Sequence, residues 1–303
     1  MPDVYAPRRP PRSEFLTLRG LRHHLLRWDR PVPGQAPLVL VHGWMDVAAS
    51  FQFMVDALPA GREVIALDWR GFGLSGTTGA DCYWFPDYLG DLDALLDAVS
   101  PGAPVDLLGH SMGGNVAMSY AGVRPQRVRR LVNLEGFGLP DTAPDAAPER
   151  LAAWLDELKA PPTLRPYATL ADVAARLMKT NPRLPADKAA WLAGQWARPG
   201  ADEGREGFLL NADPAHKRTN PMLYRKAEVL ACWRRIAAPT LWVEGSDEQL
   251  TRFWGGRYPR EDFEARLAQV PALQRAVLAD AGHMLHHDQP EALAAHISAF
   301  LAD

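Results

Sequence analysis

The stretch VDLLGHSMGGNVAM, residues Val105 to Met118, decides the fold of this chain. It begins as an apolar run, turns through Gly109 to Gly113, and continues with the spacing of a helix. A strand that leads through G-x-S-x-G into a helix holds its serine in strained backbone geometry, and glycines flank the serine because side chains there would collide. The first N–H groups of the helix favour negative charge beside Ser111. The stretch therefore predicts a strand, a sharp turn and a helix, with Ser111 as a candidate nucleophile.

Short apolar runs recur along the chain, and each ends in turn residues. They are PLVLVHG (37–43), EVIALDWRG (63–71), VDLLGH (105–110), RRLVNLEG (129–136), PTLWVEG (239–245) and RAVLAD (275–280). Unbroken apolar runs are typical of strands that are covered on both faces, and an earlier pair, EFLTLRG and RHHLLRWD, predicts a hairpin at an antiparallel edge. The sequence therefore predicts an α/β fold: a mostly parallel central sheet of about eight strands with helices on both faces.

The alternation of strand and helix patterns stops after Gly138. From Leu139 to about Arg225 the strand signals are lost, and stretches such as PERLAAWLDELKA and LADVAARLMKT have helical spacing. The strand pattern returns at PTLWVEG. We therefore predict a discontinuous core, residues 1–138 and 226–303, with an inserted helical cap at 139–225 in which substrate choice should lie.

The composition limits the classes of partner. The 303 residues carry a formal net charge of -3, which gives no electrostatic basis for binding nucleic acid or an anionic membrane. The two cysteines, Cys82 and Cys232, are too few for a disulfide framework, and neither a signal peptide nor a long apolar span is evident. We predict a cytoplasmic protein, a monomer or homodimer, that acts on a small molecule.

A serine hydroxyl needs a base to take its proton and an acid to orient that base. His283 is the candidate base, because it follows the last predicted strand in LADAGHML. His286 and His287 come directly after it, but the spacing of carboxylates and histidines does not favour a metal site. We therefore interpret these two histidines as supporting or surface residues, and predict no metal and no cofactor.

Three carboxylates are candidates for the acid. Glu248 and Asp247 lie in the loop after 239–245, and Glu135 ends the preceding strand run. The chain order serine, acid, histidine is the one expected for this type of sheet. The remaining requirement is an oxyanion hole, for which the turn in LVLVHGWMD would supply the N–H of Trp44 beside that of Met112.

Taken together, the motifs resemble the α/β-hydrolase superfamily over nearly the whole chain apart from the cap. They are HGW (42–44), DWRGFGLS (68–75), GHSMGG (109–114) and GH (282–283), in the order and spacing of that family. HGWMDVAASF is especially similar to the serine-hydrolase-like and small-ester hydrolase branch. The resemblance implies Ser111 as nucleophile, His283 as general base and acid, and the N–H groups of Trp44 and Met112 as the oxyanion hole.

The resemblance also bears on the acid. The family's acid usually stands three residues after the glycine that ends the penultimate strand, which gives Glu248 here, with Asp247 as its neighbour. Aspartate is the usual residue at that position, so glutamate is a departure. Haloalkane dehalogenases take a glutamate from the position of Glu135, but they and the epoxide hydrolases use an aspartate nucleophile. Ser111 argues against both of those reactions.

The sequence thus favours hydrolysis of a carboxylic ester through an acyl-enzyme, with Ser111, His283 and either Glu248 or Asp247 as the triad. The same residues can cleave thioesters, amides, lactones or carbon–carbon bonds, or carry out perhydrolysis. The alternative from another class is a binding protein that keeps the fold without turnover, since fold does not imply function.

Overall fold

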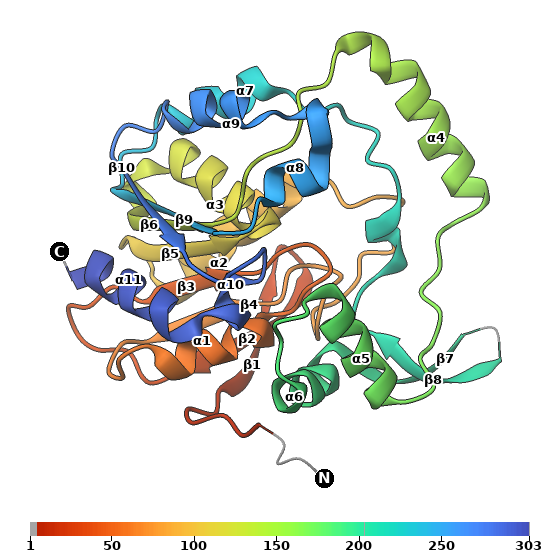
Figure 1. Cartoon of the computed structure of the whole chain (residues 1–303), viewed down its shortest axis with the longest axis horizontal. Helices are drawn as coiled ribbons and strands as arrows, with labels where there is room; N and C mark the ends of the chain where they lie inside the picture. The colour runs from red at the N-terminus through yellow and green to blue at the C-terminus, as the bar shows by residue number, and fades with distance from the viewer. Residues whose placement is uncertain (1–4, 203, 303) are drawn as a thin grey trace.

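The computed structural model describes residues 5–202 and 204–302, and in these residues a sheet of eight strands forms the centre of the molecule (Figure 1). In spatial order the strands are β1 (Arg12–Leu18), β2 (Leu21–Trp28), β4 (Val64–Leu67), β3 (Leu38–Val41), β5 (Val105–His110), β6 (Val128–Leu134), β9 (Thr240–Gly245) and β10 (Leu273–Leu278). The first two form an antiparallel hairpin whose second strand pairs antiparallel with β4, and all the remaining pairs are parallel. The predicted mostly parallel sheet is confirmed.

Helices cover both faces of this sheet because its strands are apolar on both faces. In β3, Val39 and Val41 join the core cluster that also contains buried residues of the helices on one face, whereas Leu38 and Leu40 join the cluster of the opposite face. The helices of the first face are α2 (Phe85–Val99), α3 (Met112–Val123), α7 (Lys226–Trp233) and α9 (Arg260–Leu267). Those of the second face are α1 (Gln52–Ala57), α10 (Leu285–Asp288) and α11 (Pro290–Ala302). No helix in the described part of the chain is long and apolar enough to cross a membrane.

The segment between β6 and β9 is mostly helical but also contains a hairpin. Its elements before α7 are α4 (Ala147–Lys159), α5 (Leu170–Thr180), α6 (Ala186–Trp196), β7 (Ala197–Asp202) and β8 (Arg205–Leu210). The last four lie together, with a buried core of their own that Phe53 of α1 joins. Helix α4 has no fully buried residue and arches away from the body of the molecule (Figure 1).

The β7–β8 hairpin differs from the sequence prediction, which placed only helices here. Pro199, Gly200 and Gly207 lie inside its strands, and these residue types weaken any strand pattern. Packing decides the conformation instead, because Ala197 and Leu210 are buried in the core of the segment. Gly207 fits because a side chain there would lie 2.3 Å from the carbonyl oxygen of Tyr167.

The carboxyl ends of the parallel strands meet at one edge of the sheet. Trp44 follows β3, Ser111 follows β5 and Glu135 follows β6. Asp247 comes after β9 and His283 after β10. Residues far apart in sequence are thereby collected at this edge.

Candidate active site

Ser111 lies between β5 and α3 in a backbone conformation that side-chain-bearing residues rarely adopt. Its φ is 53° and its ψ is -116°, and its N–H donates to the carbonyl of Leu134 at 2.8 Å. Such strain costs roughly 1–3 kcal/mol and persists only where the surroundings enforce it. The turn holds the hydroxyl at the edge of the sheet, at the start of α3.

The glycines of the turn are required by close backbone approach. A Cβ atom on Gly109 would lie 2.3 Å from the carbonyl oxygen of Gly113, and one on Gly113 would lie 2.2 Å from the carbonyl oxygen of Val41. The carbonyl of Val41 cannot move without disturbing β3, and that of Gly113 cannot move without disturbing the first turn of α3. The glycine positions predicted from the motif therefore have a steric cause.

We expect Gly113→Ala to destabilise the fold by about 3 kcal/mol, because the added methyl group meets backbone of β3 on one side and cannot find space by a side-chain rotation. Gly194→Ala is the matched control: no atom lies within 4 Å of the position its Cβ would take, and it lies in α6. The control should be equally stable, or more stable by up to about 1 kcal/mol. Urea unfolding followed by circular dichroism measures both. Equal stability of Gly113→Ala and wild type would contradict the steric account.

His283 contacts Ser111 directly. Its Nε2 lies 3.0 Å from the Ser111 Oγ, so the ring nitrogen can accept the hydroxyl proton. The loop that carries His283 is fixed from two sides: the N–H of Gly282 donates to Asp288 at 2.9 Å, and the His110 ring donates to the carbonyl of His283 at 2.8 Å. The ring edge of His283 also faces Phe253, with 4.9 Å between centroids.

The carboxylate beside His283 belongs to Glu135. Its Oε2 lies 3.0 Å from the Nδ1 of His283, and its Oε1 accepts the N–H of Gly245 at 2.8 Å. The side chain is completely buried, and burial raises the pKa of Glu135, while the His283 hydrogen bond and charge act in the opposite direction. Glu135 itself has a φ of 56°, a turn that directs its side chain back along the sheet edge.

Glu248, the first choice from the sequence, does not contact His283 but is exposed and caps α8 (Gln249–Trp254), where it accepts the N–H of Thr251 at 3.3 Å. Asp247 forms a bidentate pair with Arg183 at 2.7 and 3.1 Å, and this arginine lowers the pKa of Asp247. Both carboxylates are thus engaged elsewhere. Glu135, the third candidate, is the carboxylate that contacts His283.

The turn after β3 lies against Ser111. A Cβ atom on Gly43 would be 3.2 Å from that of Ser111, so the backbone leading into Trp44 passes beside the serine. The indole of Trp44 donates to the carbonyl of His216 at 3.2 Å, which fixes the residue. Met112 is the first residue of α3, so its N–H has no acceptor within the helix.

His286 and His287 are not surface residues. Both are buried in α10, and the ring of His287 donates to the carbonyl of Ser50 at 3.1 Å. Burial lowers the pKa of His287 to about 3 and holds that of His286 well below its usual value. The sequence pattern of adjacent polar residues gives no sign of this burial.

Asp288 is a further residue that supports the site. This carboxylate accepts the N–H of Gly282 and, at 2.8 Å, the side-chain amide of Asn181 at the end of α5. It therefore links the loop of His283 to the segment between β6 and β9. No motif marks Asp288, because its partners are distant in sequence.

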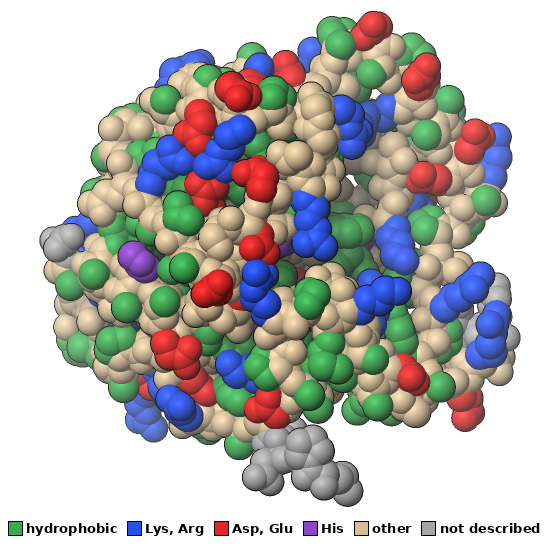
Figure 2. All heavy atoms as spheres, viewed as in Figure 1, with side chains coloured by type: hydrophobic (Ala, Val, Ile, Leu, Met, Phe, Trp, Pro, Cys, Tyr) green, Lys and Arg blue, Asp and Glu red, His purple; other side chains and the backbone are tan. Residues whose placement is uncertain are grey.

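The surface is hollowed between α4 and the body of the molecule. Figure 2 shows Lys and Arg side chains around this hollow and hydrophobic side chains within it. A separate cavity of about 420 Å³ lies in the segment between β6 and β9, where Leu164, Tyr167 and Arg176 line it. Neither Ser111 nor His283 lines that cavity.

The fold of this chain recurs in known proteins. A family model described as the alpha/beta hydrolase fold matches residues 36–290. The chain is 26% identical over 273 residues to a serine hydrolase-like protein of Danio rerio, covering 88% of this chain and 81% of that protein. It is 27% identical over 273 residues to Esterase YbfF of Escherichia coli, covering 88% of this chain and 94% of that one.

A solved structure has the same architecture. The hypothetical protein PA1622 of Pseudomonas aeruginosa superposes with a TM-score of 0.81 and 28% sequence identity. The superposition covers 96% of this chain and 98% of that one. The similarity therefore includes the segment between β6 and β9 as well as the sheet.

Proposed function

The chain belongs to the α/β-hydrolase superfamily, and from this premise we propose that it hydrolyses a carboxylic ester through an acyl-enzyme formed on Ser111. Relatives described as serine hydrolase-like and as an esterase support a hydrolase of this kind. The proposed substrate is a small molecule with an ester or related acyl bond.

The first half of the proposed reaction transfers the acyl group to the protein. Ser111 Oγ attacks the carbonyl carbon while His283 Nε2, 3.0 Å away, takes the hydroxyl proton. The N–H groups of Trp44 and Met112 would stabilise the negative oxygen of the tetrahedral intermediate. The intermediate collapses, the bond to the leaving alkoxide breaks, and His283 gives its proton to the alcohol.

The second half releases the acid. Water attacks the acyl-enzyme, His283 takes one of its protons, and the second tetrahedral intermediate expels Ser111, which regains its proton. Throughout, Glu135 accepts the Nδ1–H of His283 at 3.0 Å. This bond keeps the lone pair on Nε2 and stabilises the imidazolium that forms in each half.

The observation that carries the proposal is the continuous contact from Glu135 through His283 to Ser111, with 3.0 Å at each step. A serine with a φ of 53° at the end of a strand supports it further, because a residue without a reactive role would gain stability from glycine there. The three side chains come from three different loops. This order and geometry of carboxylate, imidazole and hydroxyl therefore argue against a chance contact of unrelated side chains.

We also propose that residues 139–225 form a cap that selects the substrate, over a core of residues 1–138 and 226–303. The separate buried cluster of α5, α6 and the hairpin supports an independent packing unit. The exposed α4, which is tied to the chain near Thr219 and Asn220 by Glu157 and Arg150, supports an adjustable wall of the hollow seen in Figure 2. The cap assignment would explain why the sequence leaves the natural ester undefined.

The proposal is tested with the intact chain, a fluorophosphonate, and p-nitrophenyl esters of increasing acyl length. We expect a mass increase of one phosphonyl group per chain, together with ester turnover that stops in proportion to labelling. Peptide mapping should place the adduct on Ser111. Boiled protein, which has lost the geometry, is the control and should not be labelled.

Other outcomes separate the alternatives. Labelling of Ser111 without turnover of any ester would favour a carbon–carbon bond hydrolase or another acyl bond, and peracid formation with added peroxide would indicate perhydrolysis. Neither labelling nor turnover by a folded protein would overturn the proposal and favour a binding protein. Short esters should react faster than long ones if the hollow is narrow, which the acyl series measures.

A further inference from the structure

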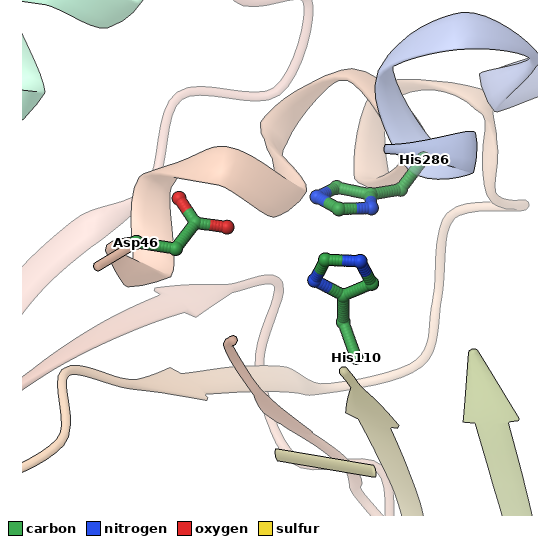
Figure 3. Close-up of side chains that lie close together, drawn as sticks. All are labelled: Asp46, His110 and His286. Atoms are coloured by element: carbon green, nitrogen blue, oxygen red, sulfur yellow. The ribbon is translucent and has the colours of Figure 1, made fainter. Parts of the chain in front are cut away.

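Three ionisable side chains converge in the protein interior, beside the loop of Ser111 but outside the contacts of the proposed triad. Asp46 comes from the loop after β3, His110 from the end of β5 and His286 from α10. One ligand atom of each lies within 4.8 Å of one ligand atom of the others, and Figure 3 shows the three side chains facing one another. Their exposed fractions are 4%, 2% and 0%.

Most of the polar atoms in this cluster lack a hydrogen bond. In the part of the chain that the structure describes, no partner is found for Asp46 Oδ2, His110 Nδ1 or either ring nitrogen of His286. Buried polar groups are almost always hydrogen-bonded, because leaving one unpaired destabilises the fold. Several such atoms at one place therefore indicate a group that the protein chain does not itself supply.

The tautomer of His110 shows which kind of group would fit. Its Nε2 donates to the carbonyl of His283 at 2.8 Å, so the lone pair is on Nδ1, the atom that faces the cluster. A neutral imidazole has one N–H and one nitrogen with a free lone pair, so His286, whose two ring nitrogens have no partner, can also present a lone pair to the cluster.

With the N–H of His286 on the nitrogen that faces away from Asp46 and His110, the cluster presents two imidazole lone pairs and a carboxylate oxygen, all of them acceptors. A single water molecule has two protons and can satisfy only two of the three. A cation with a preference for nitrogen and oxygen ligands can satisfy all three at once. The ligand set is that of zinc sites with two histidines and one carboxylate, which keep a fourth position for water.

We propose that Asp46, His110 and His286 bind a zinc ion. Zinc bonds of about 2.0–2.1 Å bring tetrahedral ligands roughly 3.3 Å apart. The three ligand atoms lie within 4.8 Å of one another, so zinc would draw them together by up to about 1.5 Å. The His110 bond to the His283 carbonyl would serve as the outer bond that orients a metal-binding histidine.

This site is independent of the proposed ester hydrolysis. Its test therefore measures the zinc content of the protein and not its activity. The untagged chain is expressed in zinc-supplemented medium, so that the ion is present while the buried site forms, and is then passed over a chelating resin. We expect about one zinc per chain by elemental mass spectrometry. Treatment with a strong chelator should then lower the midpoint of thermal unfolding, because zinc binds only the folded state.

The variants Asp46→Asn and His286→Gln should each retain less than about a tenth of the wild-type zinc, since each removes one ligand of the three. His296→Gln is the matched control, because His296 is exposed on α11 and should leave the zinc content unchanged. Asp46→Asn should fold as well as the chelated wild type, because it removes a buried charge whose second oxygen has no partner.

Wild-type protein that leaves the resin free of zinc would overturn the proposal, and so would variants at Asp46 and His286 that retain as much zinc as wild type. The first result would assign the unpaired atoms to buried water. The second would place the ion elsewhere, and His296→Gln then tests the exposed histidine directly. If His286→Gln fails to fold, the zinc contents of Asp46→Asn and of the wild type still show whether the ion binds at this cluster.

Discussion

Ser111→Ala is expected to lower kcat/KM for a p-nitrophenyl ester by at least about 10⁴-fold, because no other group can form the acyl-enzyme. That factor corresponds to about 5.4 kcal/mol of lost transition-state stabilisation. The residue that replaces serine keeps the Cβ atom and the backbone geometry of the turn, so the free energy of unfolding should change by less than about 1 kcal/mol. Ester kinetics and urea unfolding on the same preparation measure both quantities.

Ser111→Gly separates the role of the hydroxyl from that of the backbone. Glycine adopts a φ of 53° without strain, so this variant should be equally inactive and more stable than Ser111→Ala, by about 1 kcal/mol. Such a gain would indicate that the chain accepts backbone strain for the sake of the serine. Wild-type turnover in either variant would place the nucleophile elsewhere and contradict the proposed function.

Glu135→Gln is expected to lower kcat/KM by about 10³–10⁴-fold. Glutamine keeps the shape of the side chain and an oxygen for the N–H of Gly245, but its amide donates where the carboxylate accepts. His283 would then accept at Nδ1 and have its proton on Nε2, the atom that must take the proton of Ser111. The catalytic base would be present in the wrong tautomer.

Glu248→Gln and Asp247→Asn are the matched controls, because each also neutralises one carboxylate near the same edge of the sheet. Both should stay within about threefold of wild type in kcat/KM, since neither side chain contacts His283. Asp247→Asn should cost less than about 1 kcal/mol of stability, because its pair with Arg183 is partly exposed. A loss in Glu248→Gln as large as that expected for Glu135→Gln would reverse the assignment of the acid.

Glu135→Gln also needs a check of folding, because the side chain is buried. Burial raises the pKa of Glu135, so the neutral amide replaces a group whose charged form is already disfavoured by its surroundings. We expect the thermal midpoint to stay close to that of wild type. A folded but nearly inactive Glu135→Gln, beside an active Glu248→Gln, distinguishes loss of proton transfer from loss of structure.

Much of the fold was predictable because most strands of the central sheet are local apolar runs that end in turn residues. The runs at 37–43, 63–71 and 105–110 are apolar without interruption, and only a sheet covered on both faces buries such strands. The strands β7 and β8 have no such pattern. Their pairing depends on burial of Ala197 and Leu210 against α5 and α6, which is a tertiary effect that no local period records.

The sheet, the family resemblance, and Ser111 and His283 as candidates could all be inferred from the sequence, because glycine spacing and chain order are local signals of sharp turns after strands. The carboxylate that contacts His283 could be identified only from the folded chain. Glu248 and Glu135 both follow strands at the same edge, but one caps a helix while the other turns inward at a φ of 56°. Nor does any local sequence pattern indicate that His286 is buried beside Asp46. Contacts between side chains from different loops depend on the order of the strands in the sheet and on the conformation of each loop. No periodicity or spacing in a single sequence specifies these contacts.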